Sequence, residues 1–388
     1  MNLKANIYKL YLIKTAKWFM LIMPIITLFY QENGLGMAEV LLLQGIYSIA
    51  IVVLEIPSGY FADLWGRKNT LILGSFLGVL GFGIYSFSFS FSGFLIAELT
   101  LGIGQSFISG SDSALLYDSL KASHKESEYT KIEGRVLSIG NFAETIAAVV
   151  GGFIAEYSLR TPFIAQTFIA FIAVPASLTL VEPYREKLQG NRWKSILQTL
   201  NSTLAKNKEL QSLIILTAFI GTATLSMAWF IQPYLKEIQL LSLSQIGISL
   251  AVLNLIVGLT TLIAYKVEHI LGKTKSLILI ILGISFSYFG IGLIKHWSVF
   301  FILSFFYFTR GLATPILKDY INSCITSDVR ATVLSIRNFA IRVIFAIIGP
   351  FLGWYADAFN LQSALIMAGI ISIIGASISL IYYHNAKK

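Results

Sequence analysis

The residues of this sequence that could do chemistry are ionisable side chains placed inside long apolar stretches. A charge at the middle of a membrane-spanning helix costs about 2.5–3.5 kcal/mol on insertion scales, so such residues mark a polar pathway by default. A carboxylate there can bind a proton in one state and release it in another, and a cation can bind or balance an anionic or zwitterionic solute. The carboxylates are Glu55, Glu98, Asp112 and Glu144, and the cations are Lys14, Lys17, Arg310, Arg337 and Arg342.

Roles can be assigned to these residues as hypotheses. Asp112 and Glu144 are the first candidates for a coupling proton, followed by Glu98 and Glu55. Arg310, Arg342 and Lys17 are the first candidates for contacts to an anion, and the full set of substrate-binding candidates is Lys14, Lys17, Arg310, Arg342, Arg337, Asn141, Asn338 and Tyr117. The alternatives are structural ion pairs, snorkelling of Lys14 and Arg337 to the surface, and a structural role for Glu55 beside Pro57.

The elements that must position these residues are membrane helices. The chain is 56% hydrophobic and only 13% charged, with a mean hydropathy of +0.74, whereas a soluble protein carries roughly 25% charged residues. Spanning a bilayer takes about 20 apolar residues. Runs of that length predict an all-α membrane protein of twelve helices, near 8–31, 38–62, 69–90, 93–119, 129–156, 160–182, 209–235, 243–266, 275–295, 298–321, 328–356 and 361–383.

The distribution of basic residues predicts the orientation. The two tails and the even-numbered connections hold nineteen Lys and Arg residues, whereas the odd-numbered connections hold three, which are Arg160, Lys236 and Lys295. Basic residues concentrate on the cytoplasmic side of membrane proteins. The sequence therefore predicts a multi-pass protein of the bacterial inner membrane with both termini in the cytoplasm. The net charge of +9 then reflects topology and not nucleic-acid binding.

The two halves of the chain are repeats. Residues 136–143 read VLSIGNFA in the fifth predicted helix, and residues 333–340 read VLSIRNFA in the eleventh. The longest polar stretch lies between the halves. The predicted organisation is a six-helix bundle over 1–182, a cytoplasmic linker over 183–208 and a second six-helix bundle over 209–388.

A charged motif lies between the second and third predicted helices. Residues 59–68 read GYFADLWGRK, which resembles the G-x-x-x-D-x-x-G-R-K signature of the major facilitator superfamily, in the place where that family carries it. Together with the repeat, the resemblance covers essentially the whole chain. It implies two pseudo-symmetric six-helix bundles, alternating access and a solute site between the halves. It also implies a cytoplasmic gate built from Gly59, Asp63, Gly66, Arg67 and Lys68, for which Asp118 is the natural partner; the alternative is an ordinary basic loop.

Two departures from the family narrow the expected function. Glu98 stands where many proton antiporters carry a buried arginine, and Gly151-Gly152 stands where drug exporters have a Gly-Pro pair. Both disfavour a standard drug–proton antiporter. The sequence predicts a proton-coupled carrier of a small polar solute, anionic or zwitterionic, such as a metabolite or siderophore. Multidrug efflux, lipid flipping and a non-transporting sensor are the alternatives.

Other classes of function find little support. The four histidines lack metal-ligand spacing, and the only cysteine is Cys324. No complete phosphate-binding motif is present. We therefore expect no enzyme activity, no metal, no cofactor and no nucleic-acid partner. The expected partners are a small solute, a proton and the lipid bilayer, and the expected state is a monomer.

Overall fold

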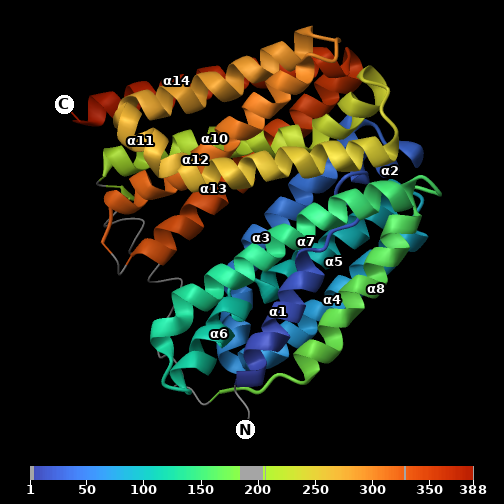
Figure 1. The fold of residues 1–388 in the computed structure, drawn as a ribbon, viewed down its shortest axis with the longest axis vertical. Helices are drawn as coiled ribbons and strands as arrows, with labels where there is room; N and C mark the ends of the chain where they lie inside the picture. The colour runs from blue at the N-terminus through green and yellow to red at the C-terminus, as the bar shows by residue number, and fades with distance from the viewer. Residues whose placement is uncertain (1–3, 184–203, 206, 327–328, 388) are drawn as a thin grey trace. The chain divides into compact units, whose positions relative to one another are not determined.

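The computed structural model describes residues 4–183, 204–205, 207–326 and 329–387. Within these ranges the chain is helical and has no strand, and ten helices are long and apolar enough to cross a membrane. Most of the predicted linker, 183–208, lies outside the described residues. The chain forms two compact units (Figure 1), which are residues 1–34, 46–192 and 242–251 in the first, and 35–45, 193–241 and 252–388 in the second.

Two irregular segments raise the number of membrane spans among the described residues from ten to twelve. Helix α11, Leu243–Leu293, has 51 residues and would measure about 76 Å if straight, more than twice the ~30 Å of the hydrocarbon core. Gly272 interrupts it with φ 72°, a conformation that glycine adopts without strain, so that α11 supplies two spans. The first predicted span is α1, Lys4–Trp18, followed by α2, Ile26–Glu32, with an unwound stretch over 19–25. The all-α, twelve-helix prediction is confirmed.

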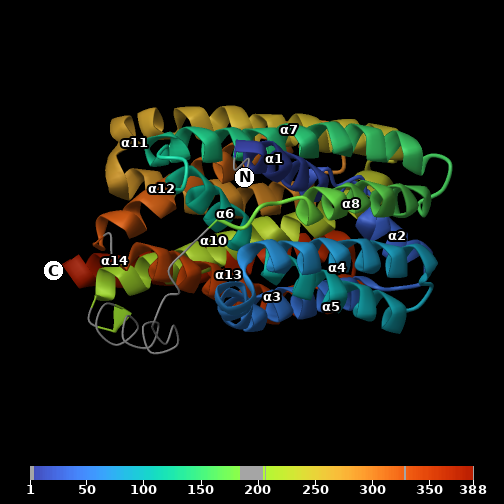
Figure 2. The ribbon, with the colours of Figure 1, turned by 90° about the horizontal axis from the view of Figure 1, so that it is seen from below.

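The first unit contains most helices of the first half of the sequence. Besides α1 and α2, these are α3 (Met37–Trp65, from residue 46), α4 (Arg67–Phe87), α5 (Phe91–Ile108), α6 (Ser111–Lys121), the short 3₁₀ turn η1 (Glu126–Glu128), α7 (Tyr129–Ala155) and α8 (Thr161–Leu178). Helix α4 lies against α5 and α8, and α1 lies against α7 and α8; Figure 2 shows α4 beside α5.

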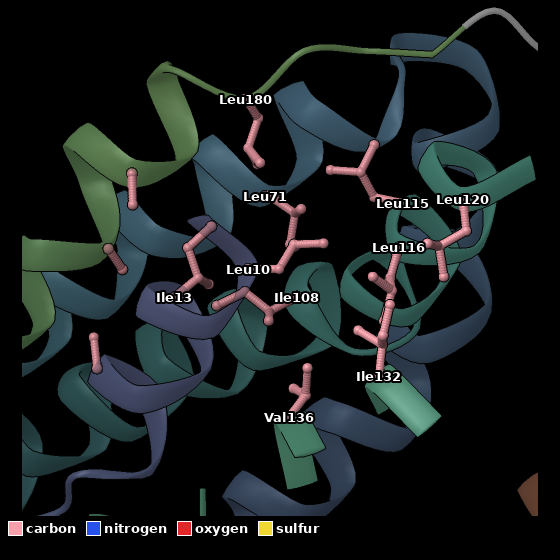
Figure 3. Packing of buried hydrophobic residues seen from close by; sticks show 13 residues of the cluster. Leu10, Ile13, Leu71, Ile108, Leu115, Leu116, Leu120, Ile132, Val136 and Leu180 are labelled. Atoms are coloured by element: carbon pink, nitrogen blue, oxygen red, sulfur yellow. The ribbon is translucent and has the colours of Figure 1, made fainter. Parts of the chain in front are cut away.

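A cluster of buried aliphatic side chains holds α1 and α6 in this unit (Figure 3). It joins Leu10 and Ile13 of α1 to Leu115 and Leu116 of α6, and Leu180 closes it after α8. In a bilayer the lipid tails are as apolar as leucine, so close packing rather than water exclusion favours this contact. The consequence is that the polar residues on α1 and α6 are held in a fixed relation to one another.

The second unit contains α10 (Lys208–Pro233), the π-helical turn η3 (Tyr234–Ile238), α11 from residue 252, α12 (Val299–Ser323), α13 (Arg330–Ala358) and α14 (Leu361–Lys387). Helix α10 packs against α13 and α14. The Tyr288 hydroxyl donates to the Ala223 carbonyl oxygen at 2.6 Å, and the Tyr382 hydroxyl donates to Gln211 Oε1 at 2.8 Å. These bonds tie α10 to α11 and to α14.

Each unit includes the start of a helix whose remainder belongs to the other unit, and a carboxylate caps each start. In the second unit, Asp357 accepts hydrogen bonds from the backbone nitrogens of Met37 and Ala38, both at 2.8 Å. In the first unit, Glu156 accepts from the nitrogen and the hydroxyl of Ser244, at 2.8 and 2.9 Å. Amides in the first turn of a helix lack helical partners, and an anion also suits the positive end of the helix dipole.

Candidate functional site

The first unit contains a buried ion pair between two of the predicted site residues. Lys14 Nζ lies 2.9 Å from Asp112 Oδ2, and both residues are less than a tenth exposed. The other carboxylate oxygen, Oδ1, accepts a hydrogen bond from the Ser113 backbone nitrogen at 2.8 Å. Lys17 lies one turn further along α1 and interacts electrostatically with both members of the pair.

Two interruptions in the helices bring these charges together. Helix α1 ends at Trp18, so Lys17 lies in its last turn. Helix α5 ends at Ile108, and Gly110, with φ 80°, turns the chain into α6 so that Asp112 falls in the first turn of α6. A cation suits the end of a helix and an anion suits its beginning, because of the helix dipole. Broken helices whose ends face a charge are typical of ion and solute sites in transporters.

Asp112 lies well inside the membrane-spanning segment that α5 and α6 form. Asp112 lies nine residues before Lys121, the last residue of α6, which is about 14 Å along the helix and about half the hydrocarbon thickness. Within the span Phe91–Lys121, Asp112 therefore lies about one third of the way from the Lys121 end. In the part of the chain that is described, no three His, Cys, Asp or Glu side chains gather as a metal site would require.

A second carboxylate, which the sequence analysis missed, extends the cluster. The Ser113 hydroxyl donates to Glu133 Oε1 of α7 at 2.7 Å. Tyr129, one turn earlier on α7, interacts electrostatically with Glu133 and with Asp112. Glu133 precedes Glu144 by eleven residues, which is three helical turns, so the two acids share a face of α7. That spacing is the signal that could have identified Glu133.

Glu98 lies in a different environment. It is buried in α5, where its Oε1 accepts hydrogen bonds from the hydroxyls of Tyr30 at 2.8 Å and Tyr85 at 2.6 Å. Phe94 packs against both tyrosine rings. Glu98 precedes Ile108, at the end of α5, by ten residues, so about 15 Å of helix separates it from the interruption that leads to Asp112. The structure thus places Glu98 in an aromatic layer, apart from the Lys14–Asp112 pair.

The remaining candidates of the first unit are more dispersed. Glu55 is half-buried in α3, and Glu144 is half-buried in α7. Asn141 is exposed. Tyr117 is 44% exposed and packs edge-on against Tyr129, with ring centroids 5.4 Å apart. None of these four is part of the Lys14–Asp112 pair.

The predicted arginines belong to the second unit. The Arg310 guanidinium lies 5.4 Å from the centre of the Tyr307 ring on α12. Arg337 donates to the Asn338 side-chain oxygen at 3.3 Å, and Asn338 is exposed. Arg342 is half-buried in α13. A joint site that combines these cations with the Lys14–Asp112 pair stays a prediction.

The charged motif forms an ion pair across the first unit. Arg67, the first residue of α4, donates through its guanidinium to the Asp118 carboxylate and to the Ala114 carbonyl oxygen of α6. Gly66 adopts φ 96°, which allows the sharp turn between α3 and α4. Asp63 and Gly59 lie in the last turns of α3. The backbone nitrogens of Arg67 and Lys68 both donate to Glu182, a residue that the sequence analysis did not single out.

Comparison with known proteins identifies the family. The family model described as Major Facilitator Superfamily matches residues 11–350. The chain is 22% identical to an uncharacterized MFS-type transporter of Methanocaldococcus jannaschii, covering 92% of each chain. It is 21% identical to multidrug resistance protein 2 of Bacillus subtilis, covering 93% of this chain and 90% of the relative.

A solved structure shares the fold of this chain. A crystal structure of a mutant of the nucleoside transporter NupG superposes with a TM-score of 0.85 at 14% identity, covering 98% of this chain and all of that one. The helix interruptions, the signature ion pair and the family match all indicate a multi-pass membrane transporter and not an enzyme. The chain belongs to the major facilitator superfamily.

Proposed function

We propose that the protein couples the movement of protons to the uptake of a small organic anion or zwitterion by alternating access. The observation that carries the proposal is the buried Lys14–Asp112 ion pair at 2.9 Å, with Lys17 beside it at the helix interruptions. Asp112 pairs directly with Lys14 alone, so we propose that a negative group of the solute contacts Lys17. We further propose that the protein works as a monomer in a bacterial inner membrane with both termini in the cytoplasm.

The coupling follows from the cost of unpaired buried charge. When Asp112 binds a proton it becomes neutral and releases Lys14, so that Lys14 and Lys17 lose the counter-charge of Asp112. Breaking a buried pair in this way costs about 3–5 kcal/mol, so the proton alone binds poorly. An anionic solute restores the balance by accepting from Lys14 and Lys17. Proton and solute therefore favour each other's binding, and the coupling is reciprocal.

Release on the opposite side reverses these steps. Asp112 loses its proton, pairs again with Lys14 and displaces the anionic group of the solute. Glu133, linked to the Asp112 carboxylate through Ser113, offers a second proton acceptor beside the pair. Arg310 and Arg342 are proposed to contact a second polar group of the solute. Glu144 is proposed as the alternative proton carrier, with Glu98 and Glu55 after it.

Export of drugs is the second candidate, because one relative covering 93% of this chain carries the name multidrug resistance protein. Two lysines at a helix interruption suit an anion better than the organic cations that many exporters remove. The missing Gly-Pro pair in α7, where Gly151-Gly152 stands, also disfavours this candidate. A flippase or a sensor finds no specific support among the described contacts.

Purified protein in liposomes tests the proposal. Labelled organic acids, amino acids and organic cations would be offered with a pH gradient imposed and with the gradient absent. We expect an acid or zwitterion to accumulate only with an inward proton gradient, accompanied by internal acidification. Asp112→Asn should abolish accumulation yet preserve solute exchange, because exchange does not require net proton release. Wild-type accumulation by Asp112→Asn would contradict the assignment of the proton, and gradient-driven expulsion of organic cations would favour the second candidate.

A further inference from the structure

Four residues after α8 form a strap across the end of the first unit that carries its basic loops. The strap is Thr179, Leu180, Val181 and Glu182, and each member is held by another helix. Lys9 donates to the Thr179 carbonyl oxygen, and Leu180 is buried in the aliphatic cluster of Figure 3. The Val181 nitrogen donates to Asn6 Oδ1 at 3.0 Å, and Asn6 Nδ2 donates to the Val181 carbonyl oxygen at 2.7 Å.

The last residue of the strap caps the helix that begins with the signature arginine. Glu182 Oε1 accepts from the Arg67 nitrogen at 2.9 Å, and Oε2 accepts from the Lys68 nitrogen at 2.7 Å. These amides open α4 and have no partner within the helix. Gly66, at the N-cap, has no side chain with which to cap them. A Cβ atom on Gly66 would lie 3.2 Å from the Glu182 carboxyl group, so the glycine also leaves space for this cap.

The strap reaches both partners of the signature ion pair. Glu182 holds the backbone of Arg67, whose guanidinium bonds to Asp118. Asn6, which is fully buried, donates through the same Nδ2 to the Ser119 hydroxyl at 2.9 Å, next to Asp118 on α6. Arg67 and the neighbour of Asp118 on α6 are thereby held by residues that belong neither to the signature nor to α4 or α6.

We propose that Glu182 and Asn6 are positioning residues for the Arg67–Asp118 pair, and that the strap sets how firmly the predicted cytoplasmic gate closes. Residue 183 and the connection between the halves follow Glu182 directly in the chain. The strap therefore fastens the start of that connection to the signature. The proposal rests on transport by alternating access, and it is independent of the solute and of proton coupling.

A distance measurement between the two halves tests the proposal. Spin labels would be attached at Lys121→Cys and Lys275→Cys, both exposed, in a Cys324→Ser background, and the populations of short and long distances would be measured by pulsed electron spin resonance. Glu182→Gln should raise the ratio of long to short distances about three- to ten-fold, since lost caps weaken helix starts by an amount of that order. Asp118→Asn should raise it as well.

The decisive result is the double variant. If Glu182 acts through Arg67, Glu182→Gln should add nothing to the shift already produced by Asp118→Asn. Glu128→Gln is the matched control, because Glu128 pairs with Lys125 on the exposed surface of the same unit at 3.1 Å, and it should leave the distances unchanged. If Glu182→Gln does not accumulate in the membrane, Asn6→Ala removes the bonds to Val181 and to Ser119 and should produce the same shift.

Two outcomes would overturn the proposal. One is a lower unfolding temperature in Glu182→Gln with unchanged distances, which would make the residue a stabilising cap only. The other is a shift that adds fully to that of Asp118→Asn, which would make the two residues independent. Neither outcome depends on which solute is carried, so failure here is separate from failure of the proposed function.

Discussion

Gly151 of α7 meets the backbone of Leu21 so closely that a Cβ atom on Gly151 would lie 2.0 Å from the Leu21 carbonyl oxygen. Leu21 belongs to the unwound stretch between α1 and α2, and its nitrogen donates to Gln166 Oε1 of α8 at 2.8 Å. The unwound stretch is thus held by α7 on one side and by α8 on the other. Its amide is satisfied without a helix, as a buried amide must be.

Gly151→Ala should therefore strongly reduce both the stability of the protein and its transport activity. The added methyl group cannot fit unless the backbone moves, and overpacking of a core typically costs about 1–3 kcal/mol. We expect a lower unfolding temperature in detergent and loss of transport. Gly134→Ala is the matched control, because it makes the same change in the same helix where no atom lies within 4 Å of the added Cβ. Equal behaviour of the two variants would refute the close approach.

Lys17 should determine the affinity for the solute and not the number of protons carried with it. A hydrogen bond to a charged group contributes about 1.5–3 kcal/mol, so Lys17→Gln should raise the KM for an anionic solute about tenfold or more. The number of protons carried per solute should stay the same, because Asp112 remains in place. Lys131→Gln, an exposed residue of α7, is the control and should leave KM unchanged. Initial rates of uptake into liposomes over a range of solute concentrations measure both.

Arg160 should be essential for the stability of the first unit. Its guanidinium donates to the carbonyl oxygens of Ser86 and Ser88 at 3.0 and 2.8 Å and to Asn33 Oδ1 at 2.9 Å. Burial lowers the pKa of Arg160, but an arginine stays charged at neutral pH. A lysine lacks the planar fork of donors, so Arg160→Lys should cost about 2 kcal/mol.

Thermal unfolding in detergent measures this loss. The control is Arg330→Lys, which makes the same substitution at an exposed position of α13. An unchanged unfolding temperature in Arg160→Lys would show that the stability of the first unit does not depend on the hydrogen bonds of the guanidinium.

The carboxylate caps should each contribute to stability. Asp357→Asn keeps the shape of the side chain but loses one acceptor oxygen and the charge that favours the start of α3. Loss of a helix cap costs about 0.5–2 kcal/mol, so we expect a lower unfolding temperature. Asp319→Asn, at an exposed site of α12, is the control and should leave the unfolding temperature unchanged. A larger effect at Asp319 than at Asp357 would contradict the capping role.

The orientation in the membrane is open to a direct test. Topology reporters fused at Asn191 and at Lys388 should be cytoplasmic, and a reporter at Ser90 should be on the opposite side, because of the nineteen-to-three distribution of basic residues. An external signal at Asn191 would contradict the arrangement of two six-helix halves.

The helices and the family could be predicted from sequence because their signals are local. Hydropathy located the seventh predicted helix, 209–235, close to α10 at Lys208–Pro233. The repeat and the signature are short stretches that can be compared by eye. The unwound stretch over 19–25 was missed, since an apolar run reads the same whether or not its backbone is helical.

The contacts of the candidate site could not be predicted in the same way. Lys14 and Asp112 are 98 residues apart in the chain, and Glu182 is 115 residues from Arg67. No local pattern encodes which of several acids a buried lysine will meet. Arg160 is an example. In the sequence it is only one of the three basic residues in the odd-numbered connections. In the structure its guanidinium donates to three backbone carbonyl oxygens and to one side-chain amide oxygen.

In each half of the chain, a hydrogen bond joins the first helix to the last segment. Asn6 bonds to Val181, which joins the first helix of the first half to the end of the sixth, and Gln211 bonds to Tyr382, which joins the first helix of the second half to the last. Neither bond involves the connection between the two halves. A backbone break within 184–203 would thus leave both fastenings intact, so the gene could be divided there and its two products supplied as separate polypeptides.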